Sequence, residues 1–119
     1  MELEIEVDAI AGVLVVVVLG DVVEHSLGRL QECLDGAIDG GRPVVVDLLA
    51  ADEIDDAGVR MLVDVHDELG TRLRVVVERG SVVHRRLKEA GIAHVLALHR
   101  STVSALAASS QPEQVERRS

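Results

Sequence analysis

The sequence predicts an α/β domain with a mixed sheet of four to five strands, flanked by about four helices. Strand-like apolar runs alternate with helical patterns after residue 13, which indicates parallel βαβ crossovers. The 119 residues suffice for one domain, and 48% of them are hydrophobic, which supplies a single core. Phe, Trp and Tyr do not occur, so this core consists of the smaller aliphatic residues that suit a sheet covered by helices.

The first half of the chain predicts two strands, a helix and a third strand. MELEIEV (1–7) alternates apolar and polar residues, as an edge strand does, and AGVLVVVVLG (11–20) is a run typical of a strand buried on both faces. PVVVDLL (43–49) predicts another central strand. The helix between them is indicated by apolar residues at helical spacing, followed by a glycine pair: Leu27, Leu30, Leu34, Ile38, Gly40 and Gly41.

After the third strand, a corner ADEIDDAG (51–58) leads into a second helix that Gly70 ends. LRVVVE (73–78) predicts a fourth strand. Ser81 is expected to cap a third helix, which Gly91 ends.

The last part of the chain predicts a short strand, a short helix and a tail. IAHVLAL (92–98) is the expected final strand, and STVSALAA (101–108) is a helix opened by a Ser-Thr cap. Residues 109–119 are polar, without periodicity, and are predicted to be disordered, so the domain is expected to span residues 1–108.

Composition and charge exclude several classes of partner. The formal net charge is −9, which disfavours nucleic acid and anionic membranes, and no aromatic ring is present on which bases could stack. The apolar run 13–19 is too short to span a bilayer, and the N-terminus lacks the basic start of a signal peptide, so a cytoplasmic protein is expected. An acidic surface favours a protein partner with a basic patch.

No catalytic, metal or cofactor site is predicted. The four carboxylates Asp52, Glu53, Asp55 and Asp56 could hold a hard cation. Capping is the favoured interpretation, because Asp55 precedes a helix and Asp56 lies where the helix dipole favours negative charge. The five histidines lack metal-ligand spacing, and neither a phosphate loop nor a nucleophile motif occurs, so we expect a protein that is not an enzyme.

The stretch VVVDLLAADEIDDAGVRMLVDVHDELGTRLRVVV (44–77) resembles the core of STAS domains of the anti-sigma-factor antagonist type. The typical sequence of that family has a buried strand that ends in Asp-Leu, then a short corner, and then Ile-Asp-Ser-Ser-Gly-Leu at the start of a helix. VVLGDV (17–22) and VVHRRLKEAGIAHVLAL (82–98) extend the resemblance, which covers roughly residues 2 to 108. It implies a single STAS-like domain.

The resemblance also implies a phosphorylation switch. In this family the second Ser of the corner is phosphorylated by a partner kinase that is itself an anti-sigma factor, of the histidine-kinase-like ATPase type, and phosphorylation releases the antagonist. Carried onto this chain, the motif reads Asp55, Asp56, Ala57 and Gly58, with Ala57 at the phospho-acceptor position. Ala57 has no hydroxyl group, so the usual switch is expected to be missing. Asp56 is an imperfect phosphate mimic, because it points about 100° away around the helix.

These arguments favour an antagonist-like interaction module, monomeric or weakly dimeric, over the alternative of a STAS sensor or scaffold that binds a small ligand or a larger signalling complex. Met61, Leu62, Val65 and Leu69 supply the core stripe of the second helix, which leaves Val59 and Val63 on its flank, either for a partner or against the first helix. The predicted partner-binding residues are Asp55, Asp56, Ala57, Gly58, Val59, Arg60 and Val63.

Overall fold

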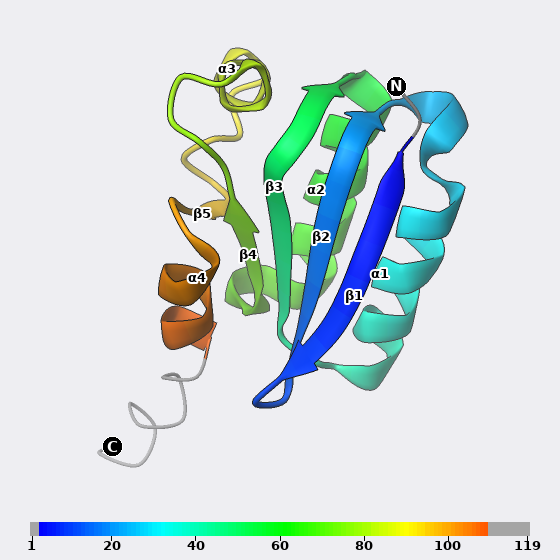
Figure 1. Cartoon of the computed structure of the whole chain (residues 1–119), viewed down its shortest axis with the longest axis vertical. Coiled ribbons are helices and arrows are strands. Elements are labelled where there is room, and N and C mark those ends of the chain that lie inside the picture. The colour runs from blue at the N-terminus through cyan, green and yellow to red at the C-terminus, as the bar shows by residue number, and fades with distance from the viewer. Residues whose placement is uncertain (1–2, 110–119) are drawn as a thin grey trace.

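Five strands form one mixed sheet in the order in which they occur along the chain (Figure 1). The computed structural model describes residues 3–109. β1 pairs antiparallel with β2, and β2 through β5 are all parallel. The predicted α/β class and the N-terminal edge strand are therefore confirmed. The strands are β1 (Glu4–Ile10), β2 (Val13–Val22), β3 (Val44–Ile54), β4 (Leu73–Val76) and β5 (Ala97–His99).

Four α-helices cover the sheet within the described residues. Figure 1 shows α1 and α2 side by side on one face, α3 beyond the carboxyl ends of the strands, and α4 beside β4 and β5. The first three helices are the crossovers between successive parallel strands, as predicted, while α4 follows the last strand. The helices are α1 (Gly28–Gly40), α2 (Asp56–Leu69), α3 (Val82–Glu89) and α4 (Thr102–Ser109), with short 3₁₀ turns η1 (Glu24–Ser26) and η2 (Gly70–Arg72).

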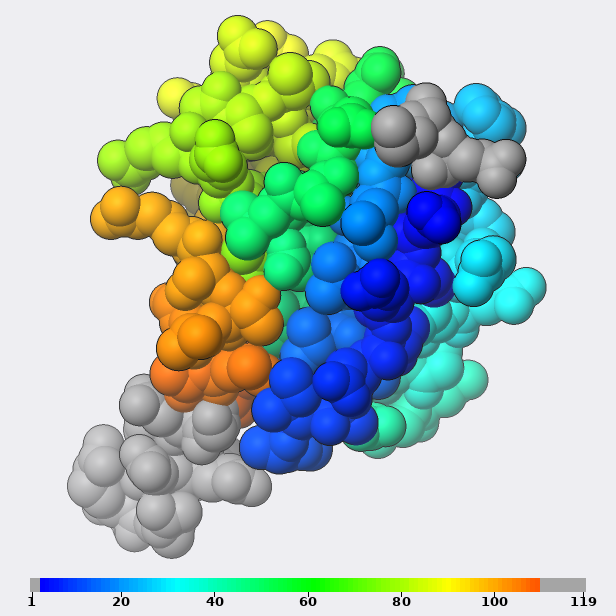
Figure 2. Space-filling model, in the orientation of Figure 1, coloured from blue at the N-terminus to red at the C-terminus, as the bar shows by residue number. Residues whose placement is uncertain are grey.

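The central strands are buried on one face under α1, α2 and α3, whereas the opposite face is covered only in part, by α4. In β2, Val16 and Val18 belong to the main core under α1, α2 and α3. Val13 and Val15 point to the other face, where a smaller cluster includes Ala105 of α4. Figure 2 shows this second face, in which α4 leaves β1 and much of β2 and β3 at the surface.

The corner expected at residues 51–58 is shorter than predicted. β3 continues to Ile54 and pairs with β2 as far as Val22, with two irregularities at each of which β3 gains one residue over β2. Asp52 and Glu53 are exposed there, so strand pairing is compatible with their charge despite their low strand propensity. The turn into α2 is therefore reduced to Asp55.

The final strand is also shorter than expected. The sequence predicts a strand over residues 92–98, but β5 begins only at Ala97. The N–H group of Ile92 donates to the carbonyl of Leu87, which ties it to the end of α3, and Val95 and Leu96 donate back to the carbonyl of Ile92. A turn thus replaces most of the expected strand. Leu96 nevertheless is buried in the main core.

The predicted tail lies largely outside the described residues. Ser109 is the last residue of α4, and residues 110–119 are not described, so the expected disorder there stays a prediction. Among the helices of residues 3–109, none is long and apolar enough to cross a membrane.

Candidate functional site

The start of α2, at the carboxyl ends of β2 and β3, is held by Asp55. One carboxylate oxygen, Oδ1, accepts the N–H of Gly58 at 3.0 Å and caps the helix, as predicted. The other, Oδ2, accepts the N–H of Glu24 at 3.0 Å in the turn that follows β2. The N–H of Asp55 itself donates to the carbonyl of Val22 at 3.1 Å. Asp55 therefore joins the start of α2 to the end of β2.

The environment of Asp55 favours its charged form. Burial by itself raises the pKa of this carboxyl group, but the surrounding backbone N–H groups, led by those of Gly58 and Glu24, outweigh that effect. The pKa of Asp55 is consequently lowered from its ordinary value. At neutral pH the Asp55 carboxylate is therefore ionised, and it holds the start of α2 to the turn that follows β2.

Gly58 allows α2 to lie very close to the sheet. A Cβ atom at this position would be 2.7 Å from Cγ1 of Ile54, 2.7 Å from the carbonyl oxygen of Val22 and 2.9 Å from Cγ1 of Val22. No side chain fits in that space without moving backbone. Gly58 is buried, so in the isolated chain this predicted partner-binding residue serves the packing of the corner.

Arg86 holds the corner from the side of α3. Its Nε donates to the carbonyl of Ile54 at 3.2 Å, and its Nη2 donates to Oδ1 of Asp56 at 3.1 Å. The side chain of Asp56 is 94% exposed, so solvent screens this ion pair and it contributes little stability. The ion pair mainly sets the direction of the Asp56 side chain, whose carboxylate is turned toward α3.

Ala57 lies in the first turn of α2 and is half-buried. Successive residues are about 100° apart around a helix, so Ala57 presents its methyl group on a different side from Asp56. Its neighbours Asp55 and Gly58 are both engaged in holding the corner together. The methyl group of Ala57, in contrast to the carboxylates of Asp55 and Asp56, makes no polar contact at the corner.

Val59 and Val63 were expected side by side on an exposed flank of α2, and the structure agrees only in part. Val59 is 9% exposed and belongs to the main core, which corrects its placement on an open flank, whereas Val63 is half-buried. The alternative of packing against α1 stays a prediction. The groove between α1 and α2 is lined from α2 by Asp64, Val65 and Glu68.

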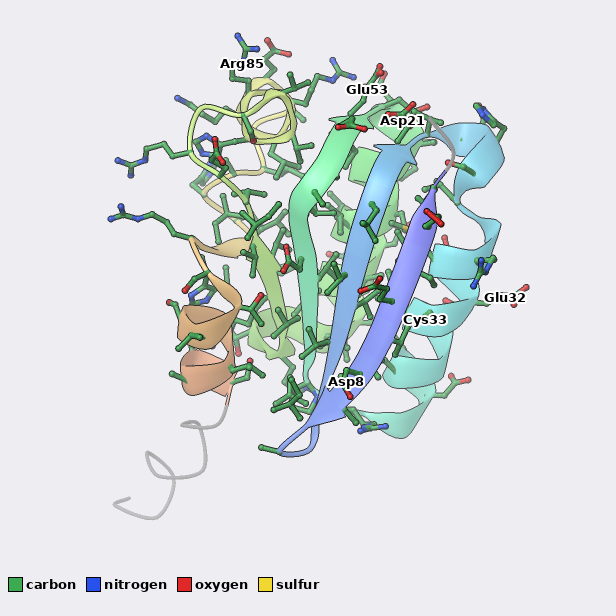
Figure 3. All side chains as sticks on the ribbon, viewed as in Figure 1. Asp8, Asp21, Glu32, Cys33, Glu53 and Arg85 are labelled. Carbon is green, nitrogen blue, oxygen red and sulfur yellow. The ribbon has the colours of Figure 1, made fainter. Side chains whose placement is uncertain are left out.

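The carboxylates near the corner point in different directions. Asp52 and Glu53 are exposed on β3, while Asp55 caps α2. Figure 3 shows Asp21 and Glu53 at the ends of β2 and β3, next to the start of α2. Within residues 3–109, no group of three or more His, Cys, Asp or Glu side chains is placed to hold a metal ion. Asp52, Glu53 and Asp56 are exposed at this end of the molecule, and so is Arg60.

The sequence that forms this sheet, its corner and its helices matches a known family. The model of the STAS domain matches residues 4–105. The chain belongs to the STAS domain family. No curated protein sequence matches it significantly.

Solved structures share this STAS fold. An anti-sigma factor antagonist from Mycobacterium paratuberculosis superposes with a TM-score of 0.83 at 23% identity, over 91% of this chain and 94% of that one. A putative anti-sigma factor antagonist from Thermotoga maritima gives 0.76 at 11% identity, over 87% and 92% of the two chains. The unphosphorylated anti-sigma factor antagonist SpoIIAA gives 0.63 at 15% identity, over 97% of each chain. These likenesses establish the architecture of a single STAS domain.

Proposed function

We propose that this STAS domain is an antagonist-like interaction module that binds an anti-sigma factor of the histidine-kinase-like ATPase type, and that it is not phosphorylated at the family's usual position. The architecture it has in common with anti-sigma factor antagonists supports the general role. The proposed contact surface is the start of α2 and its exposed side, formed by Asp56, Ala57, Arg60 and Val63.

The observation that carries the proposal is the alanine in the first turn of α2. A phosphate at this position would add about two negative charges at a helix start, where backbone N–H groups and the helix dipole stabilise an anion. Ala57 offers no oxygen to accept it. The charge of Asp56 is an imperfect replacement, because Asp56 lies about 100° around the helix from Ala57 and its carboxylate pairs with Arg86 of α3. The module is therefore proposed to remain in its binding state.

A capture experiment with a charged variant tests the proposal. The immobilised chain is incubated with a lysate of the cells from which the sequence comes, bound proteins are identified by mass spectrometry, and the captured ATPase is then purified. Ala57→Glu is expected to weaken its binding at least about tenfold, since one charge would sit where a phosphate acts in the family. The variant should stay folded, because an acidic residue in the first turn favours a helix.

Ala107→Glu is the matched control, because Ala107 is exposed on α4, away from the corner. Its binding should equal that of the native chain. Capture of no such ATPase, or an equal loss of binding in both variants, would count against the proposed partner surface. A bound metabolite in place of a protein would favour the sensor alternative.

A further inference from the structure

A hollow with a basic wall lies at the carboxyl ends of β4 and β5. It consists of two adjoining depressions whose linings share Arg79, His84 and Leu98. In Figure 2 the yellow-green segment that follows β4 and the orange segment that follows β5 project from the left edge with a recess between them. We call it the cationic hollow, and its basic lining residues are Arg79, His84, Lys88, His94, His99 and Arg100.

This concentration of positive charge is unexpected in a chain of net charge −9. Both Arg79 and Arg100 are exposed, and no ion pair within residues 3–109 neutralises either of them. Glu78 lines a third depression beside the hollow, together with both arginines, yet it forms no ion pair with them. The two guanidinium groups are therefore free to bind an anion from outside.

The two histidines next to the arginines have unused hydrogen-bonding nitrogens. Nδ1 of His84 accepts the N–H of Gly80 at 3.1 Å, so the neutral ring carries its proton on Nε2. Nδ1 of His99 is 3.0 Å from Oγ of Ser104, and its Nε2 is buried with no hydrogen-bond partner in the described part of the chain. Nε of Arg74, on the neighbouring strand β4, is also buried without a hydrogen-bond partner in this part of the chain.

The location agrees with the topology of the sheet. Arg79 follows the end of β4, and Arg100 directly follows the end of β5. The carboxyl ends of these parallel strands lie at one edge of the sheet, so the loops that follow β4 and β5 meet there. The hollow lies on the far side of α3 from the corner, because His84 and Arg86 are about 160° apart around that helix.

We propose that the cationic hollow binds a small anion that carries phosphate or carboxylate groups, with Arg79 and Arg100 as its principal contacts. Guanidinium groups form paired, charge-assisted hydrogen bonds with either kind of oxyanion. Leu98 and Val77 supply an apolar floor, which leaves room for a non-polar part of the ligand. This site is separate from the proposed partner surface, and its occupancy does not depend on Ala57.

Titration with two oxyanions tests the site. Pyrophosphate and citrate are added separately to ¹⁵N-labelled protein, at constant ionic strength adjusted with chloride, and the amide and histidine ring signals are followed by NMR. We expect saturable shifts at Arg79, Arg100, His84 and His99 with at least one of the two probes, and the stronger probe distinguishes a phosphate from a carboxylate ligand. Shifts that do not saturate, or that chloride reproduces, would overturn the proposal.

A double variant with a matched control completes the test. Arg79→Gln with Arg100→Gln should weaken the binding at least about tenfold. Arg29→Gln with Arg85→Gln removes the same charge from two exposed arginines outside the hollow and outside the proposed partner surface, and should change affinity less than about twofold. Figure 3 shows Arg85 pointing outward from α3. Equal weakening in both double variants would mean that overall charge, and not the hollow, attracts the anion.

Discussion

Replacing Gly58 by alanine is expected to lower the free energy of unfolding by about 2 kcal/mol, which corresponds to a decrease in Tm of about 10 °C. The added methyl group would lie 2.7 Å from both Cγ1 of Ile54 and the carbonyl oxygen of Val22. Overpacking costs about 3 kcal/mol at its usual upper end, and that end applies here because the Val22 carbonyl belongs to the backbone and cannot rotate away. The better helix propensity of alanine returns about 1 kcal/mol.

Gly36→Ala separates this steric effect from helix propensity. Gly36 lies within α1, and a Cβ atom there would meet no atom within 4 Å. The same substitution is therefore expected to stabilise the protein by about 1 kcal/mol. Thermal unfolding of both variants, followed by circular dichroism, gives the comparison. A Gly58→Ala variant as stable as the native chain would show that α2 does not approach the end of β2 this closely.

Replacing Asp55 by alanine should have an effect of similar size. It removes a helix cap, at about 1 kcal/mol, and the hydrogen bond from Glu24, at about 1 kcal/mol, for a total of about 2 kcal/mol. Asp55→Asn keeps one acceptor oxygen and should lose about half of that amount. Asp52→Ala is the control, because it removes an exposed carboxylate of the same region. Urea unfolding measures all three variants.

The effect of Asp55 should depend on pH in a defined direction. Its pKa is lowered in the folded state by backbone N–H donors that outweigh the opposing effect of burial. Its stabilisation is therefore complete above the ordinary carboxyl pKa of about 3.9, and is lost as the pH falls through the lower folded value. The difference between the native chain and Asp55→Ala should be constant from pH 7 to about 5 and shrink in acid. A difference that grows in acid would contradict this role.

The architecture could be predicted from the sequence, because each strand and helix is indicated by the pattern of its own residues. Runs of valine predict β2 and β3, and the caps of α2 and α3 follow from Asp55 and Ser81, each of which accepts a backbone N–H of its own helix. The misplaced boundaries are at the outer part of β3 and the start of β5. There, pairing with β2 and a hydrogen bond to the end of α3 outweigh local propensity.

The corner was predicted only in part, because its remaining contacts join residues far apart in the chain. Arg86 binds the carbonyl of Ile54 across 32 positions, and nothing in the sequence distinguishes it from Arg85 beside it. The bond between Asp55 and Glu24 spans 31 positions and leaves no local pattern either. Val59 was misplaced because the sequence pattern does not show whether a hydrophobic residue beside the core stripe of a helix is buried or exposed. The cationic hollow depends on two loops that meet only in the fold.

The hydroxyl groups that could replace the missing phosphorylation site are engaged in structural contacts. Oγ of Ser81 caps α3 by accepting the N–H of His84 at 3.1 Å. Oγ of Ser101 accepts the N–H of Ser104 at 3.1 Å, and Oγ1 of Thr102 donates to Asp47 at 2.9 Å. A phosphate on any of the three would replace the hydroxyl group that makes this contact, and on Thr102 it would also place negative charge against the Asp47 carboxylate. We therefore expect none of them to take over the switch from Ala57.

Phosphosite mapping with the captured ATPase tests this account most directly. The native chain and Ala57→Ser are each incubated with the purified partner and Mg·ATP, and phosphorylation and retained binding are measured in the same samples. We expect Ala57→Ser to gain one phosphate on the introduced hydroxyl and to be released, while the native chain stays unmodified over residues 52–60 and bound. Phosphate on Ser81, Ser101 or Thr102 of the native chain, accompanied by loss of binding, would contradict a permanently unphosphorylated antagonist.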